Sequence, residues 1–338
     1  MNTHRALLTL LLGLFGMALS SISMASEYSV GFIRVTTPLK VTNDPMEIAV
    51  MYPTETPSKA VQLGPFELNL AIGATVAKGQ FPLVVMSHGS GGSNLGHRSL
   101  AMALSKKGFV VAMPLHPGNN YKDDTLAGSL KNYQDRPKHL RATINRMLSN
   151  EPLGKAINRQ KIAVIGHSMG GYSALAAAGG MADTGYLVAH CQTQNNKQQW
   201  PMCQGAIHHS LPAMALDHAR DERIKAVILM APMGILFASP DALSTVNTPV
   251  LLLRAEKDLE LTEPYHSDMI HQRLANNPKV TYKTIANAGH YAFITPFPDF
   301  MKPDLGPIAQ DPTGFDREAF HTTLATDVIG FLSSVFAL

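Results

Sequence analysis

The residues of this chain that could carry out a reaction are a serine in a glycine turn, an aspartate and a histidine. Ser168 is the middle residue of the pentapeptide GHSMG (residues 166–170), which follows an apolar run at 161–165 and precedes a small-residue run at 172–179. The first run predicts a buried strand and the second a helix, so the pentapeptide is a sharp turn between them. Such a turn exposes the serine hydroxyl and points free helix N–H groups at charge that develops beside it. The pattern favours attack of the hydroxyl on an acyl carbon, although a glycine turn with an exposed serine is the other interpretation of the pentapeptide alone, because Gly-x-Ser-x-Gly also arises by chance.

A nucleophilic serine needs a base, and the base needs a carboxylate that orients it. Asp258 follows a predicted strand at 249–254, and His290 follows another at 280–285. Parallel strands place their carboxyl ends at one edge of the sheet, where such folds carry their sites. We therefore predict Asp258 as the acid and His290 as the base. Three nearby carboxylates are alternatives to Asp258, namely Glu256, Glu260 and Glu263, and the alternative for His290 is a structural role among the 14 histidines of the chain.

The same chemistry needs backbone donors for the oxyanion. One is predicted at the N–H of Met169, directly after the serine. The other is predicted at the N–H of Ser90, with Gly89 as runner-up, because the apolar strand 81–87 runs into the sequence HGSGG. A merely flexible turn is the plain alternative, and a phosphate-binding loop is disfavoured because the segment lacks the spacing and lysine of a P-loop.

Seven segments carry a resemblance to a known family. They are SHGSGG (87–92), MPLHPGN (113–119), DRPKHL (135–140), GHSMGG (166–171), RIKAVILMAP (223–232), AEKD (255–258) and AGHYAF (288–293). Together they resemble the dienelactone-hydrolase-like group of secreted α/β hydrolases, which is akin to the platelet-activating-factor acetylhydrolases and more distantly to bacterial cutinases and polyesterases. The resemblance spans roughly residues 28–335 and implies a serine ester hydrolase without a cofactor. True dienelactone hydrolases have cysteine where this chain has Ser168, so dienelactone is not the expected substrate.

The order of elements indicates an α/β-hydrolase fold with a mostly parallel central sheet covered by helices on both faces. Antiparallel edge strands are predicted at 28–35 and 48–52, followed by a loop-rich edge at 53–79. Strands are further predicted at 108–113 and 224–230. Helices are predicted at 97–107, at 135–150 with Asp135 as cap and Pro137 in the first turn, near 264–275, and at 316–336.

Residues 183–220 interrupt this alternation and are predicted to form a cap over a single domain, residues 26–338. Cys191 and Cys203, the only two cysteines, are predicted to form a disulfide, the alternative being two separate buried thiols. Trp200 is predicted to help shape an acyl pocket.

The N-terminus indicates export. Arg5 precedes an apolar stretch at 6–19 and small residues that end at Ala25, which predicts a secretory signal peptide, 1–25, cleaved after Ala25. The apolar stretch is shorter than the roughly 20 residues that a membrane anchor needs. We therefore expect a periplasmic or secreted protein without a stable membrane anchor, whose last helix packs on the sheet.

Charge and residue spacing exclude some classes of partner. The net charge is +3 and no dense run of Lys and Arg is present, so nucleic acid is not an expected partner. His208 and His209 lack further ligands at metal-binding spacing, so no metal is expected. His167 is interpreted as a packed part of the turn, and His88 and His116 as hydrogen-bonding partners of loops near the site.

The predicted function is hydrolysis of a small-molecule or lipid carboxylic ester. Phospholipase, platelet-activating-factor-acetylhydrolase-like and polyesterase activities are alternatives within the same chemistry. Amide hydrolysis and a binding protein without turnover are the remaining alternatives.

Overall fold

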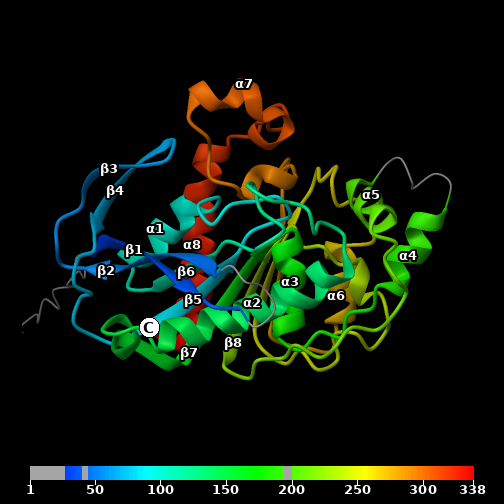
Figure 1. Cartoon of the computed structure of the whole chain (residues 1–338), viewed down its shortest axis with the longest axis horizontal. Coiled ribbons are helices and arrows are strands. Elements are labelled where there is room, and N and C mark those ends of the chain that lie inside the picture. Colours follow the sequence, from blue (N-terminus) through cyan, green and yellow to red (C-terminus); the bar gives the residue numbers. More distant parts are fainter. Residues whose placement is uncertain (1–26, 40–44, 194–199) are drawn as a thin grey trace, which may run out of the picture.

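The computed structural model describes residues 27–39, 45–193 and 200–338 of the chain. The predicted signal peptide, residues 1–25, lies outside the described residues. Within the described ranges, ten strands form one mixed sheet in the order β10-β9-β8-β7-β5-β6-β2-β1-β4-β3 (Figure 1). The strands are β1 (Ser29–Thr37), β2 (Met46–Thr54), β3 (Lys59–Leu63), β4 (Phe66–Ile72), β5 (Phe81–Ser87), β6 (Val110–Pro114), β7 (Ile157–His167), β8 (Ile224–Met230), β9 (Val250–Ala255) and β10 (Val280–Ile285).

The six neighbouring strands from β10 to β6 all run parallel, and β2 is antiparallel to both β6 and β1. Parallel neighbours require crossover connections, which helices supply on the two faces of the sheet. The main helices are α1 (Arg98–Lys106), α2 (Leu130–Leu148), α3 (Met169–Ala177), α6 (Ser267–Arg273) and α8 (Arg317–Phe336). This architecture confirms the predicted α/β class with a mostly parallel sheet.

Two hydrophobic cores lie on opposite faces of the sheet, because successive side chains of a strand point to opposite sides. In β5, Leu83 and Val85 pack in one core with α2 and α3, whereas Val84 and Met86 pack in the other with α1 and α8. All four side chains are almost fully buried. The continuous apolar runs of the central strands follow from this burial on both sides.

The strands predicted at 224–230 and 280–285 coincide with β8 and β10. The prediction of a loop-rich edge at 53–79 is wrong in part, because β3 and β4 form an antiparallel hairpin there. Most of its side chains are exposed or half-buried, so no continuous apolar run marks these strands in the sequence. The sheet therefore ends at β3 rather than at the first two strands.

Helix α2 begins earlier than predicted. Its N-cap is Ser129, whose hydroxyl accepts a backbone N–H of the first turn, and not Asp135. Pro137 consequently lies inside the helix, where it has no N–H to donate to the carbonyl of Tyr133. The hydroxyl of Tyr172 on α3 donates to that carbonyl at 2.8 Å. The proline is tolerated because a neighbouring helix replaces the missing donor.

Helix α8 coincides with the helix predicted at 316–336, and Asp316 caps it. Among the residues that the structure describes, it is the one helix long and apolar enough by composition to cross a membrane. Its apolar stripe nevertheless packs in the core against the sheet and α1, through Phe320, Leu324, Val328, Leu332 and Phe336. This packing agrees with the predicted position of the helix.

Helices α4 (Gly185–Gln192) and α5 (Pro201–His208) fall within the predicted cap. A disulfide between Cys191 and Cys203 joins them, as predicted. Helix α5 also approaches the loop before α2 closely, since a Cβ at Gly128 would lie only 2.6 Å from the Cα of Gly205. The disulfide thus links α4 to α5, and close backbone contact holds α5 against the loop before α2.

Candidate active site

Ser168 lies on the turn between β7 and α3 with a positive φ of 55°, a strained conformation that residues other than glycine seldom adopt. Its N–H donates to the carbonyl of Met230 at 3.1 Å, and its carbonyl accepts the N–H of Met233 at 3.0 Å. The flanking glycines make the turn possible, because a Cβ at Gly166 would overlap the carbonyl of Gly170. The surrounding backbone therefore holds the serine at the N-terminus of α3.

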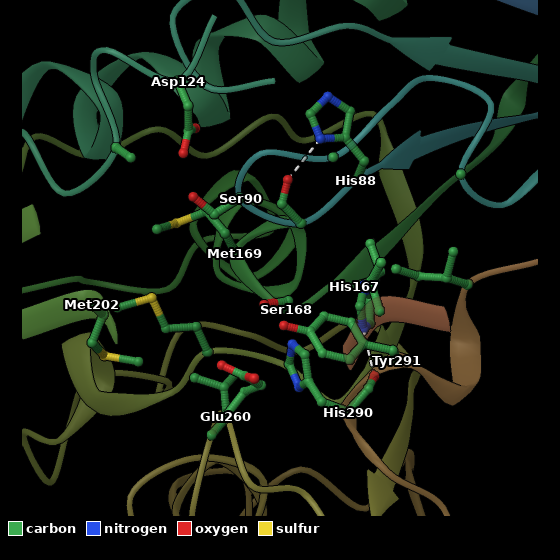
Figure 2. Close-up of a pocket in the computed structure, with 18 of the residues that line it drawn as sticks. His88, Ser90, Asp124, His167, Ser168, Met169, Met202, Glu260, His290 and Tyr291 are labelled. Carbon is green, nitrogen blue, oxygen red and sulfur yellow. Dashed lines mark hydrogen bonds between the residues drawn. The ribbon is translucent and has the colours of Figure 1, made fainter. Parts of the chain in front are cut away.

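The structure brings Asp258 and His290 together. The Nδ1–H of His290 donates to Oδ2 of Asp258 at 2.7 Å, and both side chains are more than 90% buried. The other carboxylate oxygen accepts the N–H groups of Glu260 and Leu261 at 2.9 and 2.7 Å. The proton on Nδ1 leaves Nε2 of His290 as the basic nitrogen, and Figure 2 shows the ring turned toward Ser168.

The other candidate carboxylates have different surroundings. Glu256 accepts the N–H of Asn287, and Glu263 accepts backbone N–H groups at the start of α6. Glu260 lines the cavity beside Tyr291, whose pKa is raised first by burial and then by the charge of Glu260. Asp258 is therefore the one of the four predicted candidates that contacts His290.

The loop after β5 places the predicted oxyanion donors beside the serine. A Cβ at Gly89 would lie 3.2 Å from the Cβ of Ser168, so this loop and the turn are in close contact. The carbonyl of Gly89 accepts Nδ1–H of His88 at 2.7 Å and the N–H of Gly92 at 3.2 Å. In a trans peptide the N–H points opposite to the carbonyl, so the N–H of Ser90 points away from these two donors. Ser90 and Met169 both line the cavity in which Ser168 lies (Figure 2).

A buried guanidinium supports this loop from behind. Arg136 of α2 is fully buried and donates to the carbonyl of His88, to Oδ1 of Asn119 at 2.6 Å and to Oγ of Ser173 at 3.2 Å. Burial lowers the pKa of Arg136, to about 9, which leaves it charged at neutral pH. Asn119 connects Arg136 to the loop after β5, because its own amide donates to Oγ of Ser90 at 2.8 Å.

Histidines surround this guanidinium. His116 contacts Oγ of Ser87 at 2.8 Å through Nε2 and lies 3.1 Å from His139 through Nδ1. Burial, with the charge of Arg136 added, lowers the pKa of His88 and His116, and burial lowers that of His139 to about 3. These imidazoles are neutral at physiological pH. The prediction that His88 and His116 hydrogen-bond loops near the site is confirmed.

The serine opens into a cavity of about 410 Å³. One part is lined by apolar side chains, among them Met169, Met202, Met233, Leu261 and Tyr133. Two carboxylates, Asp124 and Glu260, also line it, whereas none of its described lining residues is Lys or Arg. The cavity thus combines flexible apolar walls with negative charge.

Trp200 is predicted to help shape an acyl pocket, but it is not among the described residues that line the cavity. Its indole is buried between His190, Tyr265 and His266, and its Nε1–H donates to Oγ1 of Thr262 at 3.1 Å. It therefore anchors the start of α5. The cap residues that line the cavity are Met202, Gln204 and Gly205 of that helix.

The sequence did not identify Arg136 and Asn119 as site residues. Both lie in motifs of the family resemblance, DRPKHL and MPLHPGN, yet neither motif has a spacing that suggests chemistry. Within the described ranges, no group of three or more His, Cys, Asp or Glu side chains is arranged to hold a metal ion.

Comparison with known proteins places the chain in a family. Residues 84–302 match the model of the alpha/beta hydrolase family, and because the match covers more than half of the chain, the chain belongs to this family. Among solved structures, it is similar to a ferulic acid esterase from Streptomyces cinnamoneus, with 16% sequence identity and a TM-score of 0.56, over 93% of this chain and 92% of that chain. At this identity the similarity shows a common fold, which confirms the predicted α/β-hydrolase fold. No curated protein matches the sequence significantly.

Proposed function

We propose that this alpha/beta hydrolase is a carboxylic ester hydrolase with Ser168 as nucleophile, His290 as base and Asp258 as orienting acid. The observation that carries the proposal is the His290–Asp258 hydrogen bond of 2.7 Å beside a serine held at positive φ on a helix N-terminus. This arrangement allows a base to remove the serine proton while a fixed carboxylate stabilises the resulting imidazolium.

In the proposed reaction, Oγ of Ser168 forms a bond to the ester carbonyl carbon, and Nε2 of His290 takes the hydroxyl proton. The N–H groups of Met169 and Ser90 donate to the resulting oxyanion. The carbon–alkoxide bond then breaks, and His290 returns the proton to the leaving alcohol. Water, deprotonated by His290, releases the acid from the acyl-enzyme and restores Ser168.

The lining of the cavity favours a neutral ester. Asp124 and Glu260 oppose an anionic substrate, and the methionine-rich wall suits an apolar acyl group of variable shape. A small-molecule or lipid ester fits these properties, and phospholipase, platelet-activating-factor-acetylhydrolase-like and polyesterase activities remain alternatives. Membership of the dienelactone-hydrolase-like group is part of this proposal and is supported by the seven motifs. The solved structure to which the chain is similar is a ferulic acid esterase, which adds support for ester hydrolysis.

The first test is hydrolysis of p-nitrophenyl esters of increasing acyl length by the mature protein. We expect activity on neutral esters that Ser168→Ala abolishes, together with labelling of Ser168 by a fluorophosphonate probe. Labelling without ester hydrolysis would point to amide substrates instead. A folded protein that neither labels nor hydrolyses any ester would favour the binding protein.

We further propose that residues 1–25 direct export and that the mature domain, 26–338, carries a cap at about 183–220. The Cys191–Cys203 disulfide supports this, because such bonds persist in oxidising compartments. Cell fractionation with N-terminal sequencing tests the proposal, and a mature protein that begins at Ser26 outside the cytoplasm is the expected result.

A further inference from the structure

The turn that carries His290 is bonded to three buried histidines that the proposed reaction does not use. Nε2 of His167 lies 2.9 Å from the carbonyl of His290 itself. Nδ1 of His97 lies 2.9 Å from the carbonyl of Phe293. Nε2 of His321 lies 3.0 Å from the carbonyls of both Ala292 and Ile294.

These contacts fix the tautomers. A carbonyl oxygen only accepts hydrogen bonds, so the nitrogen facing it must carry the proton. His97 is therefore protonated on Nδ1, and His167 and His321 on Nε2. In His321 the second nitrogen then accepts from Oγ of Ser99 at 2.7 Å. In His167 the second nitrogen is buried and has no hydrogen-bond partner among the described residues.

The three imidazoles are neutral. Each side chain is more than 90% buried, and burial lowers the pKa of His97 and His321 to about 4 and that of His167 well below its ordinary value. A second proton on His167 would also lack an acceptor. Neutral imidazoles donate one hydrogen bond each without the desolvation penalty of a buried charge.

The three histidines come from separate parts of the fold that meet at this turn. His97 precedes α1, His167 ends β7 next to Ser168, and His321 lies on α8. The ring of His167 also packs against the rings of His97 and His290, at centroid distances of 5.3 and 4.9 Å. Because His167 is itself the residue before Ser168, its hydrogen bond links the backbone of the base directly to the nucleophile turn.

We propose that His97, His167 and His321 are positioning residues that hold the 290–294 turn by its carbonyls, so that Nε2 of His290 stays aimed at Ser168. The role rests on the proposed function, because it matters only if His290 is the base. A shift of the reacting groups by about 1 Å costs on the order of 100-fold in rate, so a loosened turn lowers kcat. His97 and His167 also line the cavity, whereas His321 is not among its described lining residues, so KM is the control at His321.

The experiment exchanges each histidine for an amide that copies one ring nitrogen. The Asn amide stands close to the position of Nδ1, and the Gln amide close to that of Nε2. His97→Asn should keep kcat within a few-fold and His97→Gln should lose about 10- to 100-fold. At His167 the order should reverse, with Gln retaining activity and Asn losing it, and His321 should follow His167. Leu at each position should lose kcat, and at His321, which is not among the described residues that line the cavity, KM should stay nearly unchanged.

Opposite preferences for Asn and Gln at His97 and at His167 distinguish a positioning role of these histidines from a packing role. A purely structural role would rank Asn and Gln by size, in the same order at every position, and that result would overturn the proposal. Thermal unfolding of each variant shows which remain folded. Where a Leu variant does not fold, the Asn and Gln pair at that position decides.

A measurement that does not depend on catalytic activity tests the positioning role separately from the proposed ester hydrolysis. Imidazole ¹⁵N NMR of the wild-type protein should show His97 as the Nδ1–H tautomer and His167 and His321 as Nε2–H. The opposite tautomers would overturn the positioning role even in an active enzyme. The expected tautomers in a protein without esterase activity would contradict the proposed function alone.

Discussion

Two supports hold the candidate site, and they use different chemistry. On one side of Ser168, a single guanidinium from α2 donates to loop 88–92 and to the residues that brace it. On the other side, neutral imidazoles from three parts of the chain donate to the carbonyls of turn 290–294. Arg136 supplies several donors from one side chain but must be kept charged inside the protein. The imidazoles avoid that desolvation cost but require three residues to converge.

A backbone segment can therefore be fixed by several donors on one side chain or by single donors on several residues. A concentrated support fails when one residue is lost, because several buried acceptors lose their donor together. A distributed support should weaken in steps. The predictions below test this difference in order of decreasing effect.

Replacing Arg136 with Met should have the largest effect. The change removes the donor to the carbonyl of His88 and to Oγ of Ser173. It also removes one of the two donors to Oδ1 of Asn119, which keeps the amide of Asn132. We expect the free energy of unfolding to fall by about 3–5 kcal/mol and kcat to fall with it. Urea unfolding and ester hydrolysis measure the two, with His97→Leu as the matched change in the other support. Equal losses in both variants would remove the distinction between the supports.

Removing the cap disulfide should lower stability without touching either support. The double variant Cys191→Ser/Cys203→Ser loses a crosslink with a sequence separation of 12, for which the chain-entropy model gives about 3 kcal/mol. Because α5 lines the cavity through Met202, we expect KM and the acyl-length preference to change and kcat to be nearly kept. A large loss of kcat in the folded variant would show that the cap also positions the reacting groups.

Replacing Ser90 with Pro tests the oxyanion side directly. Residues 89–92 form a turn with a 3.2 Å hydrogen bond from the N–H of Gly92 to the carbonyl of Gly89, and Gly91 has a φ of 61°. This is the pattern of a type II turn, which accepts proline at its second residue. Ser90→Pro should therefore keep the turn and delete one donor, lowering kcat about 100-fold or more, or about 2.7 kcal/mol.

The control is Ser90→Ala, which keeps the N–H and removes only the hydroxyl that accepts from Asn119. It should lower kcat far less than the proline variant does. Equal effects of the two changes would assign the role to the hydroxyl instead.

Acid should weaken the imidazole support gradually. The folded pKa values of His97 and His321 are about 4, below the ordinary value of about 6.5, so the unfolded chain binds more protons between these values. Stability from these groups is complete above about pH 6.5 and is lost as the pH falls toward about 4. Each histidine contributes a slope of up to about 1.4 kcal/mol per pH unit in this range.

Urea unfolding between pH 4.5 and 7.5 measures that slope. Among the charged groups facing the two histidines, Arg98 lowers both pKa values further, and Arg317 lowers that of His321. A protonated His321 also lowers the pKa of His97. The double variant His97→Asn/His321→Gln should flatten the dependence while stability at pH 7.5 changes less. An unchanged slope would mean that these two imidazoles do not titrate on unfolding.

Much of the fold could be predicted because its signals are local. Strand β8 contains the apolar run 226–230, and β10 is rich in β-branched and aromatic residues. The last helix has its spaced apolar residues and its Asp316 cap in the sequence. The start of α2 could not be predicted in the same way. Pro137 favours a helix start when only its neighbours are considered, and the donor that allows it mid-helix is Tyr172 of another helix.

The site residues also divide into those with a local sequence signal and those without one. Asp258, His290 and Ser168 follow strand ends, so topology alone indicated that they would meet. His97 and His321 could not be found, because they act on a backbone segment that lies 196 and about 30 residues away in the sequence, and donating to a carbonyl leaves no motif. For Trp200 the sequence leaves the role open, because an aromatic residue in this segment suits either a pocket wall or an anchor.

The contact between Tyr172 and the carbonyl of Tyr133 also bears on the order in which the protein assembles. The middle turn of α2 cannot complete its hydrogen bonding alone, so the carbonyl of Tyr133 needs water as its donor until α3 docks. The helix that carries Arg136 and the helix that begins beside Ser168 therefore become ordered as one cooperative unit. The nucleophile turn and the support of its oxyanion loop would then appear in the same step of folding.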